Sequence, residues 1–222
     1  MDADRSPLFC DAALAARIER AEAQLMAAGA LVQVELAHVG DPEIGALLTA
    51  RGYRLASFEN VLGRALDGGL ERETPPGVEV RRSGDDEFGA WIDVVADGFA
   101  HPDAQGVPSH EQFPRAVIER AERDFAAAGV VRYAALRDGV VAGGASVLLA
   151  DGIAQLAGAA TAPAHRRHGV QTALLAARLA DAVAAGCDIA VVTTQPASRS
   201  QRNVQRRGFD LLYTRAVLVK MP

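Results

Sequence analysis

The sequence predicts an α/β (α+β) protein in which alanine-rich helices pack on a β-sheet. Half of its 222 residues are hydrophobic and 23% are charged, so the chain has enough apolar material for a core. Aromatic residues make up only 5% and alanine is abundant, which favours small-residue helices lying on strands. Helical periodicity alternates along the chain with short strand-like runs.

The N-terminal part of the chain contains residues that are typical of helix ends. Asp11 is placed to cap a first helix, and Gly29 to end it. Asp41-Pro42 opens a short helix that ends at Gly52. We therefore expect a helix, a strand, a short helix and a strand, at residues 11–29, 32–36, 42–51 and 58–62.

A linker rich in Gly, Pro and charge is predicted at 68–77, between an N-terminal part (1–67) and a larger C-terminal domain (78–222). In the larger domain, Asp138-Gly139 predicts a hairpin turn. The expected strands lie at 78–81, 130–136, 140–149, 152–161, 189–194 and 211–219. The expected helices lie at 85–99, 111–125, 170–185 and 198–207, and 100–110 is expected to be a loop.

The two ends of the sequence resemble each other. The N-terminal part is expected to run helix, strand, helix, strand, with Ala28-Gly29 after the first helix and Arg51-Gly52-Tyr53 after the second. The C-terminal end is expected to have the same order, with Ala185-Gly186 and Arg207-Gly208-Phe209 at the matching positions. The spacing from the first glycine to the second is 23 residues in one copy and 22 in the other. We interpret the N-terminal part as a half-repeat of structural character, because it has Leu8-Phe9-Cys10 where the second copy has a basic glycine turn.

That basic turn is the strongest functional signal. A small-residue strand runs through Pro163 into the segment 166–171, Arg-Arg-His-Gly-Val-Gln, and then into an amphipathic helix. Backbone N–H groups at a helix N-terminus attract negative charge, and Gly169 lets a ligand approach closely. The geometry suits a diphosphate.

Residues 78–222 resemble the GNAT superfamily of acyl-CoA-dependent N-acetyltransferases. The resemblance rests on 166–171, which follows the family's pattern of Gln or Arg, two residues, Gly, one residue and Gly or Ala. Pro163 before it, Thr172-Ala173-Leu174-Leu175 after it and the order of elements also fit. The resemblance implies a mixed, mostly antiparallel sheet flanked by helices. Gln171 departs from the pattern, and it would either crowd the diphosphate or donate a further hydrogen bond to it.

The resemblance also implies binding roles for acetyl-CoA as co-substrate. Main-chain groups of Ala160 and Thr161 would pair with the pantetheine arm, and an N–H there would polarise the thioester carbonyl. Asn203 is placed like polar residues that contact the pantetheine region. The cradle for the diphosphate would be formed by Arg167, His168, Gly169, Val170, Gln171 and Thr172, with added charge from Arg166.

Catalytic residues are harder to assign. Some members of the family have a tyrosine acid at the position of Val204, which leaves Tyr213 as the candidate acid. The signature strand carries only Gln155, which accepts no proton at neutral pH. The candidate bases stay open among Asp93, Asp97, His101, His110 and Glu111, and the loop 100–110 is the expected substrate gate.

The remaining features narrow the class of protein. A net charge of −5 argues against a nucleic-acid partner, and no apolar run is long enough for a membrane span. The histidines, with Cys10 and Cys187, do not fall at metal-ligand spacings, so no metal is expected. We expect a cytoplasmic monomer or homodimer that acetylates a small-molecule or protein amine. The alternative is a catalytically weak module that binds acyl-CoA or a protein partner without turnover.

Overall fold

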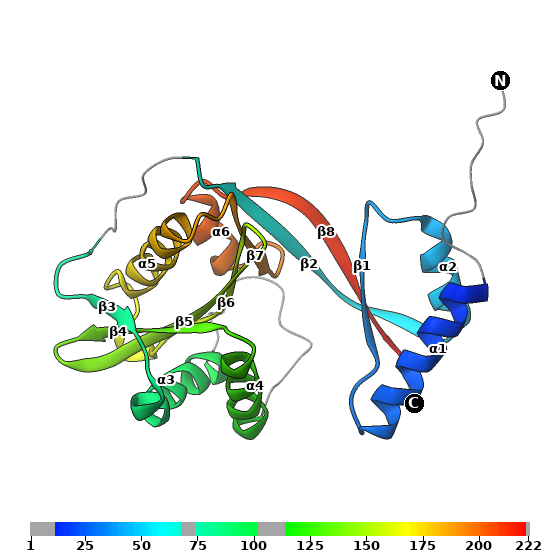
Figure 1. Cartoon of the computed structure of the whole chain (residues 1–222), viewed down its shortest axis with the longest axis horizontal. Coiled ribbons are helices and arrows are strands. Elements are labelled where there is room, and N and C mark those ends of the chain that lie inside the picture. The colour runs from blue at the N-terminus through cyan, green and yellow to red at the C-terminus, as the bar shows by residue number, and fades with distance from the viewer. Residues whose placement is uncertain (1–11, 68–73, 102–113, 221–222) are drawn as a thin grey trace. The chain divides into compact units, whose positions relative to one another are not determined.

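The computed structural model describes residues 12–67, 74–101 and 114–220 (Figure 1). The helices are α1 (Ala12–Ala27), α2 (Pro42–Ala50), α3 (Phe88–Ala100), α4 (Arg115–Ala127), α5 (Val170–Ala184) and α6 (Arg199–Gln205). The strands are β1 (Gln33–Ala37), β2 (Tyr53–Ala65), β3 (Glu79–Arg82), β4 (Val131–Arg137), β5 (Val140–Ala150), β6 (Ile153–Thr161), β7 (Ile189–Thr194) and β8 (Asp210–Lys220). Two 3₁₀ turns, Asp85–Glu87 and Pro163–His165, precede α3 and α5.

The strands form one mixed sheet in the order β1-β8-β2-β7-β6-β5-β4-β3. The run from β3 to β6 is antiparallel, and β6 and β7 are parallel. The predicted fold class, an α/β protein with a mixed sheet flanked by helices, is confirmed. The chain divides into two compact units, unit 1 (Met1–Val61 with Leu211–Pro222) and unit 2 (Leu62–Asp210).

In unit 2, helices cover both faces of the sheet, with α5 on one face and α3 and α4 on the other (Figure 1). Two adjacent glycines of β5 permit this close packing. A Cβ on Gly143 would lie 2.6 Å from Val170 Cγ1 of α5, and a Cβ on Gly144 would lie 2.6 Å from Trp91 Nε1 of α3. The Trp91 indole is fully buried and donates to the Tyr133 carbonyl at 2.8 Å, which fixes α3 on the sheet.

Unit 1 is built around a small core of Val32, Leu48 and Tyr53. Beside it, buried Glu22 accepts from Arg51 Nη2 at 2.7 Å and from Lys220 Nζ at 2.7 Å. The Arg51 guanidinium, with a smaller contribution from Lys220, lowers the pKa of Glu22 to about 2. The carboxylate therefore ties α1 to α2 and to β8.

Most predicted elements are present within a few residues of their expected ends. The main difference is the strand expected at 58–62, which begins at Tyr53 and ends at Ala65. The Asp11 cap, Cys10, most of the linker 68–77, the loop 100–110 beyond His101 and the start of the helix expected at 111–125 lie outside the described residues. The division into 1–67, 68–77 and 78–222 stays a prediction.

The two ends of the chain have the same order of elements, α1-β1-α2-β2 and α5-β7-α6-β8. The glycines that end the helices have matching left-handed backbones: φ is 66° at Gly29 and 75° at Gly186, and 88° at Gly52 and 78° at Gly208. These values are consistent with a repeat, whose common origin stays a prediction.

The last strand of each copy pairs with the first strand of the other. Strand β8 is antiparallel to β1, and β2 adjoins β7 in the sheet order. A backbone bond at the end of each pair also corresponds, since Lys220 N donates to Val32 O at 2.9 Å and Leu66 N donates to Asp188 O at 2.8 Å.

Candidate functional site

Strands β6 and β7 separate partway along their length. Their parallel register pairs 153–156 with 189–192, whereas β6 continues to Thr161 and β7 to Thr194. On its other edge, β6 stays paired with β5 through Thr161. The described part of β6 beyond Leu156 therefore has an edge toward β7 that no paired strand occupies, and an extended ligand can add there as a half-strand.

Two buried hydroxyl groups lie at the ends of these separating strands. Neither Thr161 Oγ1 nor Thr194 Oγ1 has a hydrogen-bond partner among the described residues, and Thr194 is only 5% exposed. Buried polar atoms are nearly always paired in folded proteins. These two therefore fit a ligand with its own donors and acceptors, such as the amides of a pantetheine arm.

The turn before α5 has the geometry expected of an anion cradle. Arg167 and Gly169 both have left-handed backbones, with φ of 65° and 82°. Gly169 is the N-cap of α5 and has no side chain with which to cap the helix, and the first helical bond runs from Ala173 N to Gly169 O. The amides of Val170, Gln171 and Thr172 precede that bond, so they have no partner within the helix and are the donors that an anion at this end would meet. Their role in binding a diphosphate stays a prediction.

An open pocket of about 800 Å³ lies on the side of this turn that precedes the helix. Its lining is mostly basic and consists of Pro163, Ala164, Arg166, Arg167, His168 and Arg199. Arg166 binds backbone carbonyls, since its Nε donates to Thr161 O at 3.4 Å and its Nη2 to His101 O. Arg166 therefore joins the end of β6 to the end of α3.

A buried carboxyl lies against an irregular point of β6. Between the pairs Gly144–Ala160 and Ser146–Ala157, β6 has one residue more than β5, and Gly158 in this bulge has φ of 46°. A Cβ on Gly158 would lie 3.1 Å from Glu122 Oε1 of α4. Glu122 is 4% exposed and accepts from Ser146 Oγ at 3.3 Å. Burial raises the pKa of Glu122 above its usual range, and this favours proton exchange nearer neutral pH.

Arg178 of α5 binds the same bulge through main-chain atoms. It is 2% exposed, and its Nη1 donates to Ser146 O at 3.1 Å and to Ala157 O at 3.3 Å. Its burial lowers the pKa of the guanidinium to about 10, still high enough to keep it charged at neutral pH. Arg178 thus holds β5 and β6 in the irregular conformation that Glu122 contacts.

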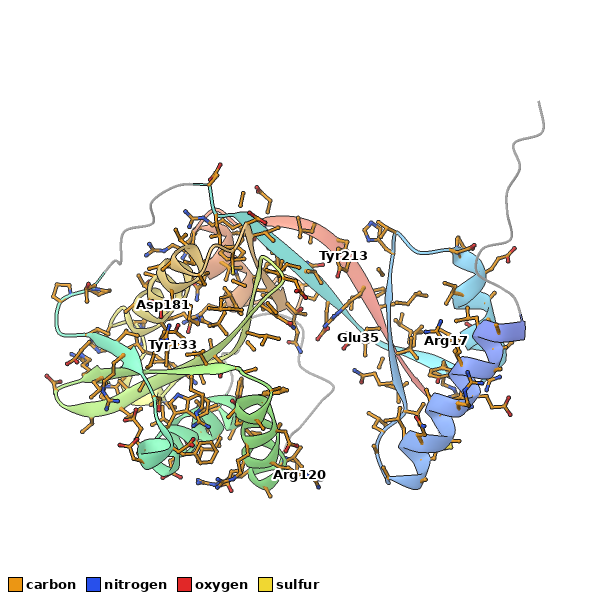
Figure 2. All side chains as sticks on the ribbon, viewed as in Figure 1. Arg17, Glu35, Arg120, Tyr133, Asp181 and Tyr213 are labelled. Atoms are coloured by element: carbon orange, nitrogen blue, oxygen red, sulfur yellow. The ribbon has the colours of Figure 1, made fainter. Side chains whose placement is uncertain are left out.

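The position of α5 is also fixed near its C-terminal end. Tyr133 of β4 donates its hydroxyl to Asp181 Oδ2 of α5 at 2.7 Å, and Arg82 Nη2 donates to the same oxygen at 3.1 Å. Figure 2 shows Tyr133 and Asp181 side by side between strand and helix. Burial raises the pKa of Tyr133 to about 12, so the hydroxyl keeps its proton and this contact persists over the physiological range.

The other predicted site residues are distributed over both units. Asn203 is half-buried on α6, next to buried Val204. Tyr213 is half-buried on β8 in unit 1 (Figure 2), whereas the cradle belongs to unit 2, so its role as an acid stays a prediction.

The candidate bases divide into two groups. Asp93 of α3 forms an exposed ion pair with Arg115, and Asp97 Oδ1 lies 3.1 Å from His101 Nδ1. His110 and Glu111 lie outside the described residues, as does the predicted gate from residue 102 onward.

Sequence reasoning missed three residues of the site. Thr194 is the last residue of a strand that was predicted correctly, and only its lack of a partner distinguishes it. Arg199 was not distinguished by its sequence context, because α6 contains another arginine, Arg202. Glu122 lies in the charged run Ile118-Glu119-Arg120-Ala121-Glu122, which suggests a solvated helix face.

No cluster of three or more His, Cys, Asp or Glu among the described residues has the arrangement of a metal site. None of the helices that the structure describes combines the length and apolar character needed to cross a membrane.

The comparisons with known proteins agree with this geometry. Residues 99–209 match the model of the acetyltransferase (GNAT) family. Among solved structures, a GCN5-related N-acetyltransferase from Kribbella flavida is similar at 22% identity over 92% of this chain and 74% of its own, with a TM-score of 0.68. No curated protein sequence matches the chain.

Two further solved structures are similar at lower identity. A GCN5-related N-acetyltransferase from Sphaerobacter thermophilus has 17% identity over 97% of this chain and 71% of its own, with a TM-score of 0.68. A tandem GNAT protein from the clavulanic acid biosynthesis pathway has 17% identity over 95% and 70%, with a TM-score of 0.64. At these identities the likeness shows the fold.

Proposed function

Because this chain belongs to the acetyltransferase (GNAT) family, we propose that it is an acetyl-CoA-dependent N-acetyltransferase acting on a small-molecule or protein amine. The observation that carries the proposal is the separation of β6 from β7, with the unpartnered Thr161 and Thr194 hydroxyls at the strand ends. The amide-rich start of α5 belongs to the same unit.

The binding roles follow from these groups. The free edge of β6 and the two threonine hydroxyls would bind the amide-containing arm of CoA, and the amides of Val170, Gln171 and Thr172 would bind its diphosphate. When bound, acetyl-CoA supplies an activated acyl group as a thioester. Holding that group beside an amine accounts for a large part of the acceleration in such reactions.

The proton of the attacking amine needs an acceptor, and we assign it to Glu122. This carboxyl lies at the bulge of the strand that would bind the thioester arm, and it is hydrogen-bonded to Ser146. The raised pKa of Glu122 makes the carboxylate a stronger base than an exposed glutamate. Glu122 takes the proton directly or through the Ser146 hydroxyl.

Two measurements test the proposal. Calorimetry should detect acetyl-CoA binding to the wild-type protein. Thr194→Val should weaken this binding without lowering the free energy of unfolding, because the lost hydroxyl has no hydrogen-bond partner in the part of the chain that the structure describes. Thiol release in the presence of a panel of amines should then identify the acceptor. Binding without turnover for every amine would favour a non-catalytic module, and no binding of acetyl-CoA would refute the proposal.

A further inference from the structure

Lysine is almost absent from this sequence. Its 23 lysine and arginine residues comprise 22 arginines and a single lysine, Lys220 at the end of β8. An arginine guanidinium stays protonated in proteins, so it has no free electron pair with which to attack an acyl group. A lysine amine attacks once it has lost a proton. Lys220 is therefore the one lysine amine in the sequence that an acyl donor such as a thioester could modify.

The Lys220 ammonium is held inside unit 1. Its Nζ donates to Glu22 Oε2 of α1 at 2.7 Å and lies 5.7 Å from the centre of the Tyr53 ring. The Lys220 side chain is 20% exposed, compared with 87% for Arg120 and 63% for Arg82. The amine is thus less open to dissolved reagents than these surface guanidinium groups.

Glu22 favours the charged form of this amine. The Arg51 guanidinium, with a smaller contribution from Lys220, lowers the pKa of Glu22 to about 2, so the carboxylate is ionised at neutral pH. A carboxylate in contact with an amine favours the protonated amine, which has no electron pair for attack. The contact between Glu22 and Lys220 must therefore open before the amine reacts.

We propose that Lys220 is a gated acylation site, whose amine reacts with an acyl thioester such as acetyl-CoA only when its contact with Glu22 opens. In that step Nζ loses one proton and attacks the thioester carbonyl, and a C–N bond forms as the C–S bond breaks. A second proton passes from Nζ to the departing thiolate, so the products are an acylated lysine, a free thiol and one proton in solvent. The inference goes beyond the proposed function, because a dissolved thioester reaches Lys220 without a binding site.

Acylation of Lys220 has a consequence for unit 1. The amide that forms carries no charge, so it no longer pairs with Glu22. Glu22 is only 6% exposed and would keep Arg51 as its remaining cation, which binds Oε2 at 2.7 Å. Removing one partner of a buried charge destabilises a fold. The modified chain therefore has a weaker connection between α1 and the end of β8.

The first test measures acylation by N-hydroxysuccinimidyl acetate, an acyl donor with no CoA part, at each lysine by peptide mass spectrometry. Arg20→Lys adds a lysine at an exposed position of α1 as an internal reference. Lys220 should react about tenfold or more slowly than this reference, the factor that one charge-assisted hydrogen bond provides. Glu22→Gln should remove most of the difference, and Glu19→Gln, at an exposed position of the same helix, should retain it. Acetyl-CoA in excess should give the same ranking.

The second test measures the consequence by urea denaturation. Lys220→Gln, which removes the charge as acylation does, should unfold at a lower urea concentration than wild type. Lys220→Arg keeps the charge and should unfold close to wild type.

Each contradicting result is distinct. Equal rates at Lys220 and at the lysine of Arg20→Lys would overturn the gate, and this comparison needs no change at Glu22. Slow reaction of Lys220 in a folded Glu22→Gln variant, at the wild-type rate, would also overturn it. A Lys220→Gln variant as stable as wild type would refute the consequence for unit 1. None of these results depends on acetyl-CoA binding, so the proposed function is tested separately.

Discussion

Gly169 and Gly139 allow backbone strain to be separated from crowding at the cradle. Both have left-handed backbones, with φ of 82° and 79°. A Cβ on Gly139 would meet no atom within 4 Å, whereas a Cβ on Gly169 would lie 2.6 Å from Pro75 Cβ and 2.7 Å from Pro75 Cγ. Alanine at either position thus experiences the same conformational strain, and only at Gly169 does it also collide with a rigid ring.

The expected magnitudes follow from this difference. The left-handed conformation costs a residue with a Cβ about 1–2 kcal/mol, so Gly139→Ala should lower the free energy of unfolding by about that amount and leave acetyl-CoA affinity unchanged. Gly169→Ala adds contacts far below the van der Waals separation, which the turn relieves only by shifting. Because that shift moves the amides of the first turn of α5, the Kd for acetyl-CoA should rise by about tenfold or more.

Urea denaturation and calorimetry on both variants provide the assay. The reasoning would be refuted if Gly169→Ala matched Gly139→Ala in both stability and affinity. A loss of stability without a loss of affinity would show that Pro75 accommodates the methyl group and that the amides are not displaced. Either result would remove Gly169 from the description of the cradle.

Two further predictions concern buried carboxylates. Glu122→Gln should lower kcat by about 10²–10⁴-fold with the acceptor amine identified by the thiol-release panel, and should remove the acidic limb of the pH–rate profile. In the wild type the midpoint of that limb should lie above the ordinary pKa range of a glutamate, because burial raises the pKa of Glu122. Glu119→Gln on the same helix is the control. An unchanged acidic limb in Glu122→Gln would exclude the role assigned to Glu122. For Glu22, whose pKa is lowered from 4.5 to about 2, the stabilisation from Arg51 and Lys220 is complete above about pH 4.5 and is lost as the pH falls toward 2. Glu22→Gln should therefore be less stable than wild type at pH 7 and converge with it in urea denaturation near pH 2; an equal deficit at both pH values would contradict the pairing.

The parts of the site that depend on local sequence were predictable. The strand, the turn at 166–169 and the start of α5 follow one another along the chain, and Gly169 has the left-handed backbone that its position requires. The strand 189–194 has the bounds that were predicted. Periodicity and turn residues define such features because every interaction involved lies within a few residues.

The features that depend on distant pairing were not predictable. The first residues of β2, from Tyr53 to Ser57, show no strand pattern of their own, and their strand conformation depends on pairing with neighbours far along the chain. Glu122 has the sequence context of a surface residue, and only the packing of α4 against the bulge at Gly158 buries it. When a distant part of the chain buries a residue, the sequence around that residue shows no periodic pattern that would predict the burial.

The pairing of β8, the last strand, with β1 near the other end of the sequence has a consequence for synthesis on the ribosome. Residues 12–61 emerge early, but unit 1 is completed only when Leu211 and the residues after it arrive, roughly 150 residues later. At translation rates of about 5–20 residues per second, this interval lasts roughly 8–30 seconds. During that time β1 lacks the strand that covers its edge, and unpaired edges invite association with other chains. The nascent chain is therefore most vulnerable to aggregation through residues 12–61, at a stage when unit 2 can already be folding.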